Sequence, residues 1–318
     1  LYFESEVSSR GKELVKKWVK KGVFKESEGA IIFPGSEHGL HDRVFINSKG
    51  YPTYEAKELA LAERHFADYK PARVVHVVGK EQTEYFKVLF RAIETLWPKT
   101  KGKEHHLVGG YLQLKGEKKM SSRTGNVITG DALIADVETR VVDLMKETKV
   151  GDTDGVRRAI TVAALKYAML KTGVSDDTAF DMEESISTSG DSGPYLLYIV
   201  ARIKSILRKV ASTHAEFLPG SGIKTKGQLV VESLEKQLLL KLAAFPEITK
   251  TAADTLNPSP IAHYLLDIAQ AFNSFYEKCP VLQAEPHIAV FRVHLISAVE
   301  KVMVKGLGLL GIHAVEEM

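Results

Sequence analysis

The stretch ARVVHVVG, residues 72–79, decides the fold of the first part of the chain. It is a compact run of β-branched residues that ends in glycine, which is typical of a buried strand in a parallel sheet. EQTEYFKVLFRAIETLW follows at once over 81–97 with the periodicity of a helix, and HHLVGGYLQL over 105–114 is strand-like. A strand, a helix and a second strand in this order predict a right-handed βαβ unit of an open α/β sheet.

Upstream of this unit, the sequence predicts two helices and a pair of short strands. The segment 5–23 places its apolar residues on one side of a helix, and Gly22 is a typical stop. Short strands joined by turns are expected within 29–35 and 43–52, and a second helix over 53–69. The first part of the chain is therefore a mixed α/β region.

Downstream, the pattern becomes helical. Helices are expected between about 130 and 175, followed by a polar stretch over 172–194 that we interpret as flexible and as containing a domain boundary. Beyond it, apolar residues recur at spacings of three and four, which predicts a helical bundle. We expect an α/β region over 1–130, a helical connector over 131–185 and an all-α bundle over 186–318.

The bulk composition is that of an ordinary globular protein. Hydrophobic residues make up 44% and charged residues 26% of the 318 residues, and the net charge of +3 neither demands nor excludes a nucleic-acid partner. Cys279 is the only cysteine, which excludes intramolecular disulfides and suits a reducing compartment such as the cytoplasm. We expect no signal peptide and no membrane span. The eleven histidines include no metal-ligand spacing such as HExxH, so we expect no metal site.

The loop KGEKKMSSRTGNV, residues 115–127, carries the clearest chemical pattern. Stabilising phosphoryl charge requires cations and hydroxyl donors that converge on it. The loop supplies these as Lys118, Lys119, Ser121, Ser122, Arg123 and Thr124. It contains no GxxxxGK[ST] and is not a Walker loop. From the residues alone, a phosphate-binding loop and a solvated basic loop both remain open.

The order of residues within the loop resembles a family signature. KMSSR, residues 119–123, resembles the KMSKS motif of class I aminoacyl-tRNA synthetases, and HLVGGYL over 106–112 resembles the strand whose backbone cradles adenine. The resemblance implies a Rossmann-type catalytic domain in which the loop closes over ATP, bound with Mg²⁺, and stabilises the departing pyrophosphate. It implies catalytic roles for Lys118, Lys119, Ser121, Ser122 and Arg123, and ATP binding by His106, Gly110, Tyr111, Leu112 and Met120. The family's second lysine falls at Ser122 here, which leaves open which basic residue of the loop replaces it.

Several segments narrow the resemblance to arginyl-tRNA synthetase: GAIIFPG, HDRVFINSKGYPTYEAKELALA, VGKEQTEYFKVLFRA and the closing GLLGIHAVEEM. The resemblance covers essentially the whole chain and implies arginine-binding roles for Tyr54, Glu58 and Gln82. The residues agree independently, because Tyr54 and Glu58 share a helix face at i,i+4 and a carboxylate matches a guanidinium bidentately. The family usually carries aspartate at the position of Glu58. Alone, these residues would be an ordinary helix-surface pair and a polar residue at a helix start.

The bundle contains an aromatic and basic face. Tyr195, Tyr198 and Arg202 stand at i, i+3 and i+7, a spacing that offers rings and a guanidinium for splayed RNA bases. The alternative is packing against a neighbouring helix. The family resemblance implies that this helix, Tyr276 and Met318 approach the tRNA anticodon arm. Lys204, Arg208 and Lys209 lie further along the same helix. Two interpretations of them stay open: further phosphate contacts, or a solvated face.

One expected motif is missing. Class I synthetases carry a HIGH-type motif in the first half of their nucleotide-binding fold, and no such motif occurs in these 318 residues. We therefore expect a portion of arginyl-tRNA synthetase that lacks the HIGH half, exposes an edge or a face of its sheet, and acts with tRNA(Arg), L-arginine, ATP and the N-terminal half of the same enzyme. The alternative is a non-catalytic tRNA-binding module. A cysteine-specific enzyme is a weaker third interpretation, because its zinc site usually includes cysteines.

Overall fold

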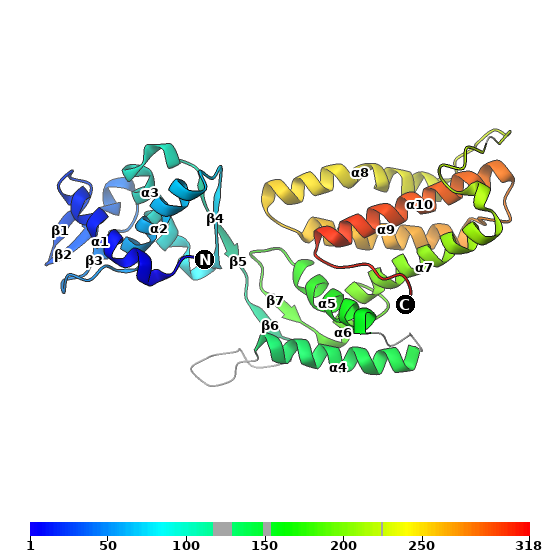
Figure 1. Ribbon diagram of the computed structural model, residues 1–318, viewed down its shortest axis with the longest axis horizontal. Helices are drawn as coiled ribbons and strands as arrows, with labels where there is room; N and C mark the ends of the chain where they lie inside the picture. Colours follow the sequence, from blue (N-terminus) through cyan, green and yellow to red (C-terminus); the bar gives the residue numbers. More distant parts are fainter. Residues whose placement is uncertain (117–128, 149–153, 224) are drawn as a thin grey trace. The chain divides into compact units, whose positions relative to one another are not determined.

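The computed structural model describes residues 1–116, 129–148, 154–223 and 225–318 (Figure 1). The chain divides into two compact units, Leu1–Gly110 (unit 1) and Tyr111–Met318 (unit 2). In the part of the chain that is described, no helix combines the length and the apolar character that crossing a membrane requires. The boundaries expected near 130 and 185 stay predictions.

Unit 1 is built from three helices and two small sheets. Its helices and strands are α1 (Glu4–Val19), β1 (Lys25–Ser27), β2 (Ala30–Phe33), β3 (Arg43–Ile46), α2 (Tyr54–Asp68), β4 (Val74–Gly79), α3 (Thr83–Leu96) and β5 (Glu104–Gly109), with short 3₁₀ turns at Gly35–His38, Lys80–Gln82 and Pro98–Thr100. Strands β1, β2 and β3 form an antiparallel sheet in that order. The helices, the strands β2 and β3 and the βαβ unit agree with the sequence, whereas β1 was not predicted.

Strands β4 and β5 form the parallel pair of the βαβ unit, in register from Val74 opposite Glu104 to Gly79 opposite Gly109. The prediction that β4 is buried is wrong for one of its faces. Val75 is 37% and Val77 66% exposed, whereas the intervening His76 packs against Phe86 of α3 with ring centroids 5.0 Å apart. A β-branched run looks the same whether one or two faces are covered, and the open face agrees with the expected exposure of the sheet.

The strand-like segment 105–114 is broken at Gly110 into two strands of different sheets. Beyond β5, the chain forms β6 (Leu112–Leu114), which pairs in parallel with β7 (Thr178–Phe180) of unit 2. The loop 115–127 therefore follows the β6–β7 ladder. The sequence suggests that this loop directly follows the second strand of the βαβ unit. In the structure, β6 comes between β5 and the loop.

Unit 2 is mainly helical. After β6 its helices and strand are α4 (Gly130–Thr148), α5 (Asp154–Leu170), β7, α6 (Met182–Ile186), α7 (Gly193–Thr213), α8 (Ser233–Thr255), α9 (Ser259–Lys278) and α10 (Pro286–Leu309), with a 3₁₀ turn at Ala215–Phe217. Figure 1 shows α8, α9 and α10 running alongside one another, and residues of all these helices share one apolar core. The predicted bundle is confirmed.

The polar stretch 172–194 is folded, and its interpretation as flexible is wrong. It contains β7 and α6, and both Ser185 and Ser192 are buried. Asp181 caps α6 by accepting a hydrogen bond from the amide of Glu184 at 3.1 Å, and Ser192 caps α7. Short polar side chains that serve as caps resemble a linker in composition.

Two close approaches set the packing of the helices. A Cβ atom added to Gly11 of α1 would lie 2.2 Å from the carbonyl oxygen of Ala56 in α2. A Cβ atom on Gly193 of α7 would lie 2.0 Å from the carbonyl oxygen of Ala163 in α5. Both positions require glycine because two backbones meet there.

Candidate functional site

Tyr54 and Glu58 lie one turn apart at the start of α2 and line the same hollow, of about 170 Å³. The hydroxyl of Thr53 donates hydrogen bonds to the carbonyls of Val44 at 2.8 Å and Phe45 at 3.1 Å, which ties the start of α2 to β3. The ring of Tyr54 is 48% exposed, whereas Glu58 is only 9% exposed. The other lining residues are Tyr2, Phe3, Glu4, Val7, Lys57 and Leu61.

Glu58 is a buried acid, and its ionised form is stable in this environment only if a cation or hydrogen bonds compensate the charge. Burial raises the pKa of Glu58 above its ordinary value of 4.5, while the hydrogen bond with Tyr54 and the nearby His76 oppose the shift. Burial and then the charge of Glu58 raise the pKa of Tyr54 to about 12. A guanidinium group in the hollow would compensate the buried carboxylate.

Close enough to Glu58 to act on its charge lies a second buried acid, Glu104, that the sequence did not single out. The Nε2 atom of His76 lies 2.8 Å from Oε2 of Glu104, whose side chain is 1% exposed. Its second oxygen, Oε1, is buried and has no hydrogen-bond partner in the structure. Beside the hollow, the rings of Tyr54 and Tyr85 lie 5.5 Å apart. Glu104 begins the strand paired with β4 and lies two positions from the register partner of His76, a proximity that arises only when the strands pair.

Gln82 lies at the junction between β4 and α3, at the N-cap position of the helix. It is half-buried, makes no capping hydrogen bond through its side chain, and does not line the hollow of Tyr54 and Glu58. The structure thus brings Tyr54 and Glu58 together and leaves Gln82 at a neighbouring strand end. Its arginine-binding role stays a prediction.

The residues predicted to bind ATP fall in both units. In unit 1, the ring of His106 is half-buried, with Nε2 3.2 Å from the carbonyl oxygen of Val78. Its buried Nδ1 has no hydrogen-bond partner among the described residues, and Gly110 follows the end of β5. In unit 2, the carbonyl of Tyr111 accepts a hydrogen bond from the amide of Thr178 at 2.8 Å. The role of these residues in ATP binding stays a prediction.

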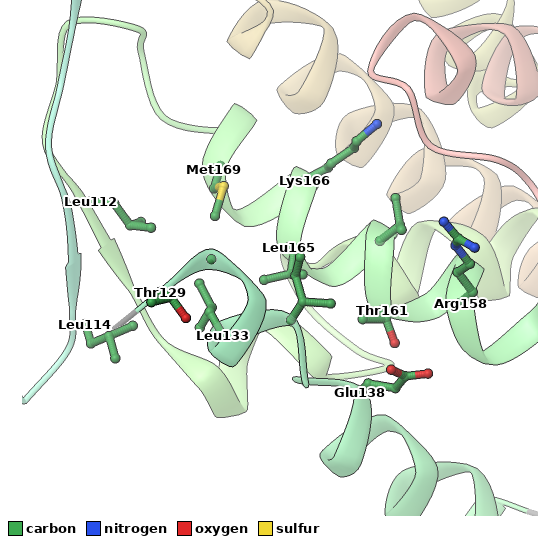
Figure 2. A pocket seen from close by; sticks show the side chains of 13 residues that line it. Leu112, Leu114, Thr129, Leu133, Glu138, Arg158, Thr161, Leu165, Lys166 and Met169 are labelled. Atoms are coloured by element: carbon green, nitrogen blue, oxygen red, sulfur yellow. The ribbon is translucent and has the colours of Figure 1, made fainter. Parts of the chain in front are cut away.

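Leu112 and Leu114 of β6 line an apolar cavity of about 640 Å³ within unit 2. Figure 2 shows these two side chains on the strand, facing Leu133 of α4 and Leu165 of α5. Lys115, the first residue of the basic loop, pairs with Asp181 at 2.7 Å, and this contact raises the pKa of the lysine. The remaining predicted loop residues lie outside the described residues: Lys118, Lys119, Met120, Ser121, Ser122 and Arg123.

In the bundle, the structure brings three of the predicted RNA-binding residues together. Nδ2 of Asn273 in α9 donates a hydrogen bond to the hydroxyl of Tyr195 at 3.0 Å, and Arg202 donates to Oδ1 of Asn273 at 3.3 Å. The guanidinium of Arg202 also lies 5.1 Å from the ring centroid of Tyr276. Tyr198 remains 39% exposed on the same helix. Sequence reasoning missed Asn273, whose only signal is its position three residues before Tyr276.

The basic residues further along α7 are engaged by the C-terminal tail. Lys204 pairs with Glu316 at 2.5 Å, and Arg208 pairs with Glu317 at 3.1 Å. Met318 is half-buried and packs against the core of unit 2. The suggested phosphate contacts of Lys204 and Arg208 stay predictions, and in this structure both side chains form ion pairs within the chain.

Comparisons with known proteins agree with this architecture. Residues 3–182 match the family described as tRNA synthetases class I (R), catalytic domain, and residues 196–318 match the DALR anticodon binding domain. The fold and these matches define a class I aminoacyl-tRNA synthetase. The chain belongs to the arginyl-tRNA synthetase family.

Individual relatives show the extent of the likeness. The chain is 33% identical to an arginine--tRNA ligase of Treponema denticola and 31% identical to one of Bacteroides fragilis, with 100% of the chain aligned. It covers 55% and 54% of those proteins, so it spans about half of their length. Among solved structures, Thermus thermophilus arginyl-tRNA synthetase matches with a TM-score of 0.83 and 26% identity, over 98% of this chain and 59% of that one.

Proposed function

We propose that this chain forms the part of an arginyl-tRNA synthetase that binds the arginine side chain and the tRNA anticodon arm. The observation that carries the proposal is the buried carboxylate of Glu58 beside Tyr54, in a chain of this family. The family's reaction joins the carboxylate of L-arginine to the α-phosphate of ATP, with Mg²⁺, and releases pyrophosphate. The tRNA 3′-terminal hydroxyl then attacks the arginyl carbonyl, and AMP leaves.

Each part of the chain has a place in that reaction. Glu58 and Tyr54 would hold the guanidinium, because a carboxylate offers it two acceptors. Gln82 would contribute from the adjacent strand end. The loop residues Lys118, Lys119 and Arg123 would stabilise the charge that develops on pyrophosphate.

The bundle would position tRNA(Arg). Tyr195, Tyr198, Arg202, Tyr276 and Met318 would face the anticodon arm, with aromatic rings available for stacking. The N-terminal half of the same enzyme would supply the HIGH-type motif that these 318 residues do not contain. A cytoplasmic location stays a prediction.

Arginine-dependent ATP–pyrophosphate exchange tests the proposal. The chain is assayed with tRNA(Arg), first alone and then with the N-terminal part of the enzyme. We expect no exchange by the chain alone and exchange once the N-terminal part is added, with omission of arginine as the control. Exchange by the chain alone would contradict the need for the other half.

The second candidate is a non-catalytic tRNA-binding module, which the match of residues 196–318 to the DALR anticodon binding domain and the lack of a HIGH-type motif in these 318 residues favour. This candidate predicts tRNA binding without exchange under either condition. The same experiment therefore separates the two functions.

A further inference from the structure

Asn273 connects side chains from two helices of the bundle. Its amide nitrogen donates a hydrogen bond to the hydroxyl of Tyr195 on α7. Its amide oxygen accepts one from Arg202, which lies about two helical turns further along α7. Arg202 in turn lies over the ring of Tyr276, which is three residues after Asn273 on α9. One side chain thus sets the relative positions of an aromatic ring and a guanidinium on α7 and links them to a second ring on α9.

The environment of Arg202 differs from that of Lys204 and Arg208 on the same helix. Lys204 and Arg208 each pair with a carboxylate of the C-terminal tail. Among the described residues, no carboxylate pairs with Arg202, whose oriented hydrogen bond goes to a neutral amide. Its charge is therefore fixed in direction and is not neutralised by any residue that the structure describes.

We propose that Asn273 is a positioning residue of the RNA-binding surface. Its neutral amide orients Tyr195 and Arg202 while it leaves the charge of Arg202 to a phosphate of the bound RNA. This inference rests on the proposed function, because it requires the bundle to bind the anticodon arm of tRNA.

The chemistry of the amide is what distinguishes this role from simple packing. Aspartate has nearly the same shape, still accepts from Arg202, and can accept from the hydroxyl of Tyr195, since a phenol donates as well as it accepts. It would, however, neutralise Arg202 in an ion pair. Alanine would release both partners and leave the charge in place.

The test compares Asn273→Asp and Asn273→Ala in the full chain. The probe is an RNA hairpin with the sequence of the anticodon arm of an arginine tRNA, and a hairpin with a scrambled loop reports non-specific binding. Gln237→Glu is the matched control, because it adds the same charge at an exposed position of α8. Affinity is measured over a range of salt concentrations, and thermal unfolding is followed in parallel.

We expect Asn273→Asp to lower affinity for the hairpin about tenfold without lowering the unfolding temperature below that of Gln237→Glu. The slope of log affinity against log salt concentration should fall by about 0.7, the value for one lost phosphate contact on a single strand. Asn273→Ala should also lower affinity but keep the wild-type slope, because Arg202 stays charged.

Wild-type affinity and slope in Asn273→Asp would overturn the inference, because a merely structural amide tolerates this isosteric change. Failure of the wild-type chain to prefer the cognate hairpin over the scrambled one would instead overturn RNA binding by the bundle. That result concerns the wild-type protein, so the two failures are distinguishable.

Discussion

Glu58 is a buried carboxyl group whose pKa is raised by its burial. Its carboxylate is 9% exposed, so replacing it with the neutral amide of glutamine keeps the shape and removes the charge that a guanidinium would meet. We expect Glu58→Gln to weaken L-arginine binding at least about tenfold. Calorimetric titration of the chain combined with the N-terminal part of the enzyme measures this.

Glu26→Gln serves as the control for that titration, since Glu26 is exposed on β1 and does not line the hollow. Its arginine affinity should equal that of the wild type. Equal affinity in Glu58→Gln would remove Glu58 from the arginine site.

The raised pKa of Glu58 also predicts a pH dependence of stability. Between 4.5 and its higher value in the folded chain, the folded state holds a proton on Glu58 that the unfolded state has lost. Raising the pH through that window therefore favours unfolding, and this contribution to stability is fully present only below 4.5. Glu58→Gln should be more stable than the wild type at about pH 7, by a difference that disappears as the pH falls.

Urea unfolding of both proteins across this range measures the difference. Burial lowers the pKa of His65, but this group is present in both proteins and cancels in the comparison. A difference that stays constant with pH would show that Glu58 does not titrate in the folded state as the structure implies.

Single residues were predictable where they belong to a spacing or to a family motif. Tyr54 and Glu58 stood at i,i+4, and the structure places both at one hollow. Asn273 and Glu104 were not predictable, because each acts on a residue that is remote in sequence and becomes adjacent only after folding. Their pairing depends on how helices and strands pack, which local patterns do not encode.

Among the helices, the contact between α1 and α2 bears directly on the hollow of Tyr54 and Glu58, since residues at the start of the chain and on α2 both line it. Gly11→Ala would force a Cβ atom to within 2.2 Å of the carbonyl oxygen of Ala56. We expect the helices to separate, with a loss of about 1–3 kcal/mol in the free energy of unfolding and weaker arginine binding. Urea unfolding and calorimetric titration measure the two effects.

Gly155→Ala is the matched control for this substitution. No heavy atom of the described residues lies within 4 Å of a Cβ atom added there, and the residue lies near the start of α5. The change should leave arginine binding untouched and stabilise the chain by about 0.5–1 kcal/mol. A loss at Gly11→Ala no larger than at this control would contradict the close approach of α1 and α2.

Helices α8 and α10 are joined by a buried charge cluster. Arg292, 3% exposed, donates to Glu235 and to Glu232 of the α8 capping box, each at 2.6 Å, and also to the carbonyl of Pro280 at 2.6 Å. Arg292→Met would leave the buried Glu235 carboxylate without its cation. We expect a loss of about 3–5 kcal/mol in the free energy of unfolding, measured in urea.

The exposed pair of Lys250 and Asp254 on α8, 3.1 Å apart, provides the comparison. Lys250→Met should cost less than about 1 kcal/mol, because solvent screens that pair. Replacing Arg292 and Glu235 together with apolar residues should recover part of the loss. Similar costs for Arg292→Met and Lys250→Met would show that the buried cluster contributes no more than a surface pair.

At this scale, the sequence predicted the helices well and the strands less well. Amphipathic periodicity identified α1, α2, α3 and the bundle helices because each has one apolar face. The burial of β4 and the break at Gly110 were not predictable, since both depend on which partners cover or pair with a strand. The caps Asp181 and Ser192 resemble part of a linker because short polar side chains are common both in linkers and at helix starts.

For the whole molecule, the two units have separate apolar cores. The core of unit 1 draws on residues from Val7 to Leu96 and that of unit 2 on residues from Leu133 to Val315. We expect residues 111–318, produced alone, to unfold cooperatively and to bind the anticodon-arm hairpin within about twofold of the full chain. Circular dichroism during heating and an RNA titration measure these properties.

Gly193→Ala within the same fragment is the control for specific packing, because the added Cβ atom would lie 2.0 Å from the carbonyl oxygen of Ala163. The substitution should lower the melting temperature of the isolated fragment. In the full chain it should lower the melting temperature of unit 2 by the same amount. A fragment that melts gradually and binds no RNA would show that unit 2 depends on unit 1.

Each core is assembled from one uninterrupted stretch of sequence, with the division after Gly110. On the ribosome, every residue of the first core is therefore synthesised before the second core begins to emerge. Unit 1 can acquire its helices and strands while the remaining residues are still being translated, and a slow or failed step in the later helices need not undo it. The order of synthesis, as well as the contacts in the folded state, therefore allows unit 1 and unit 2 to fold one after the other.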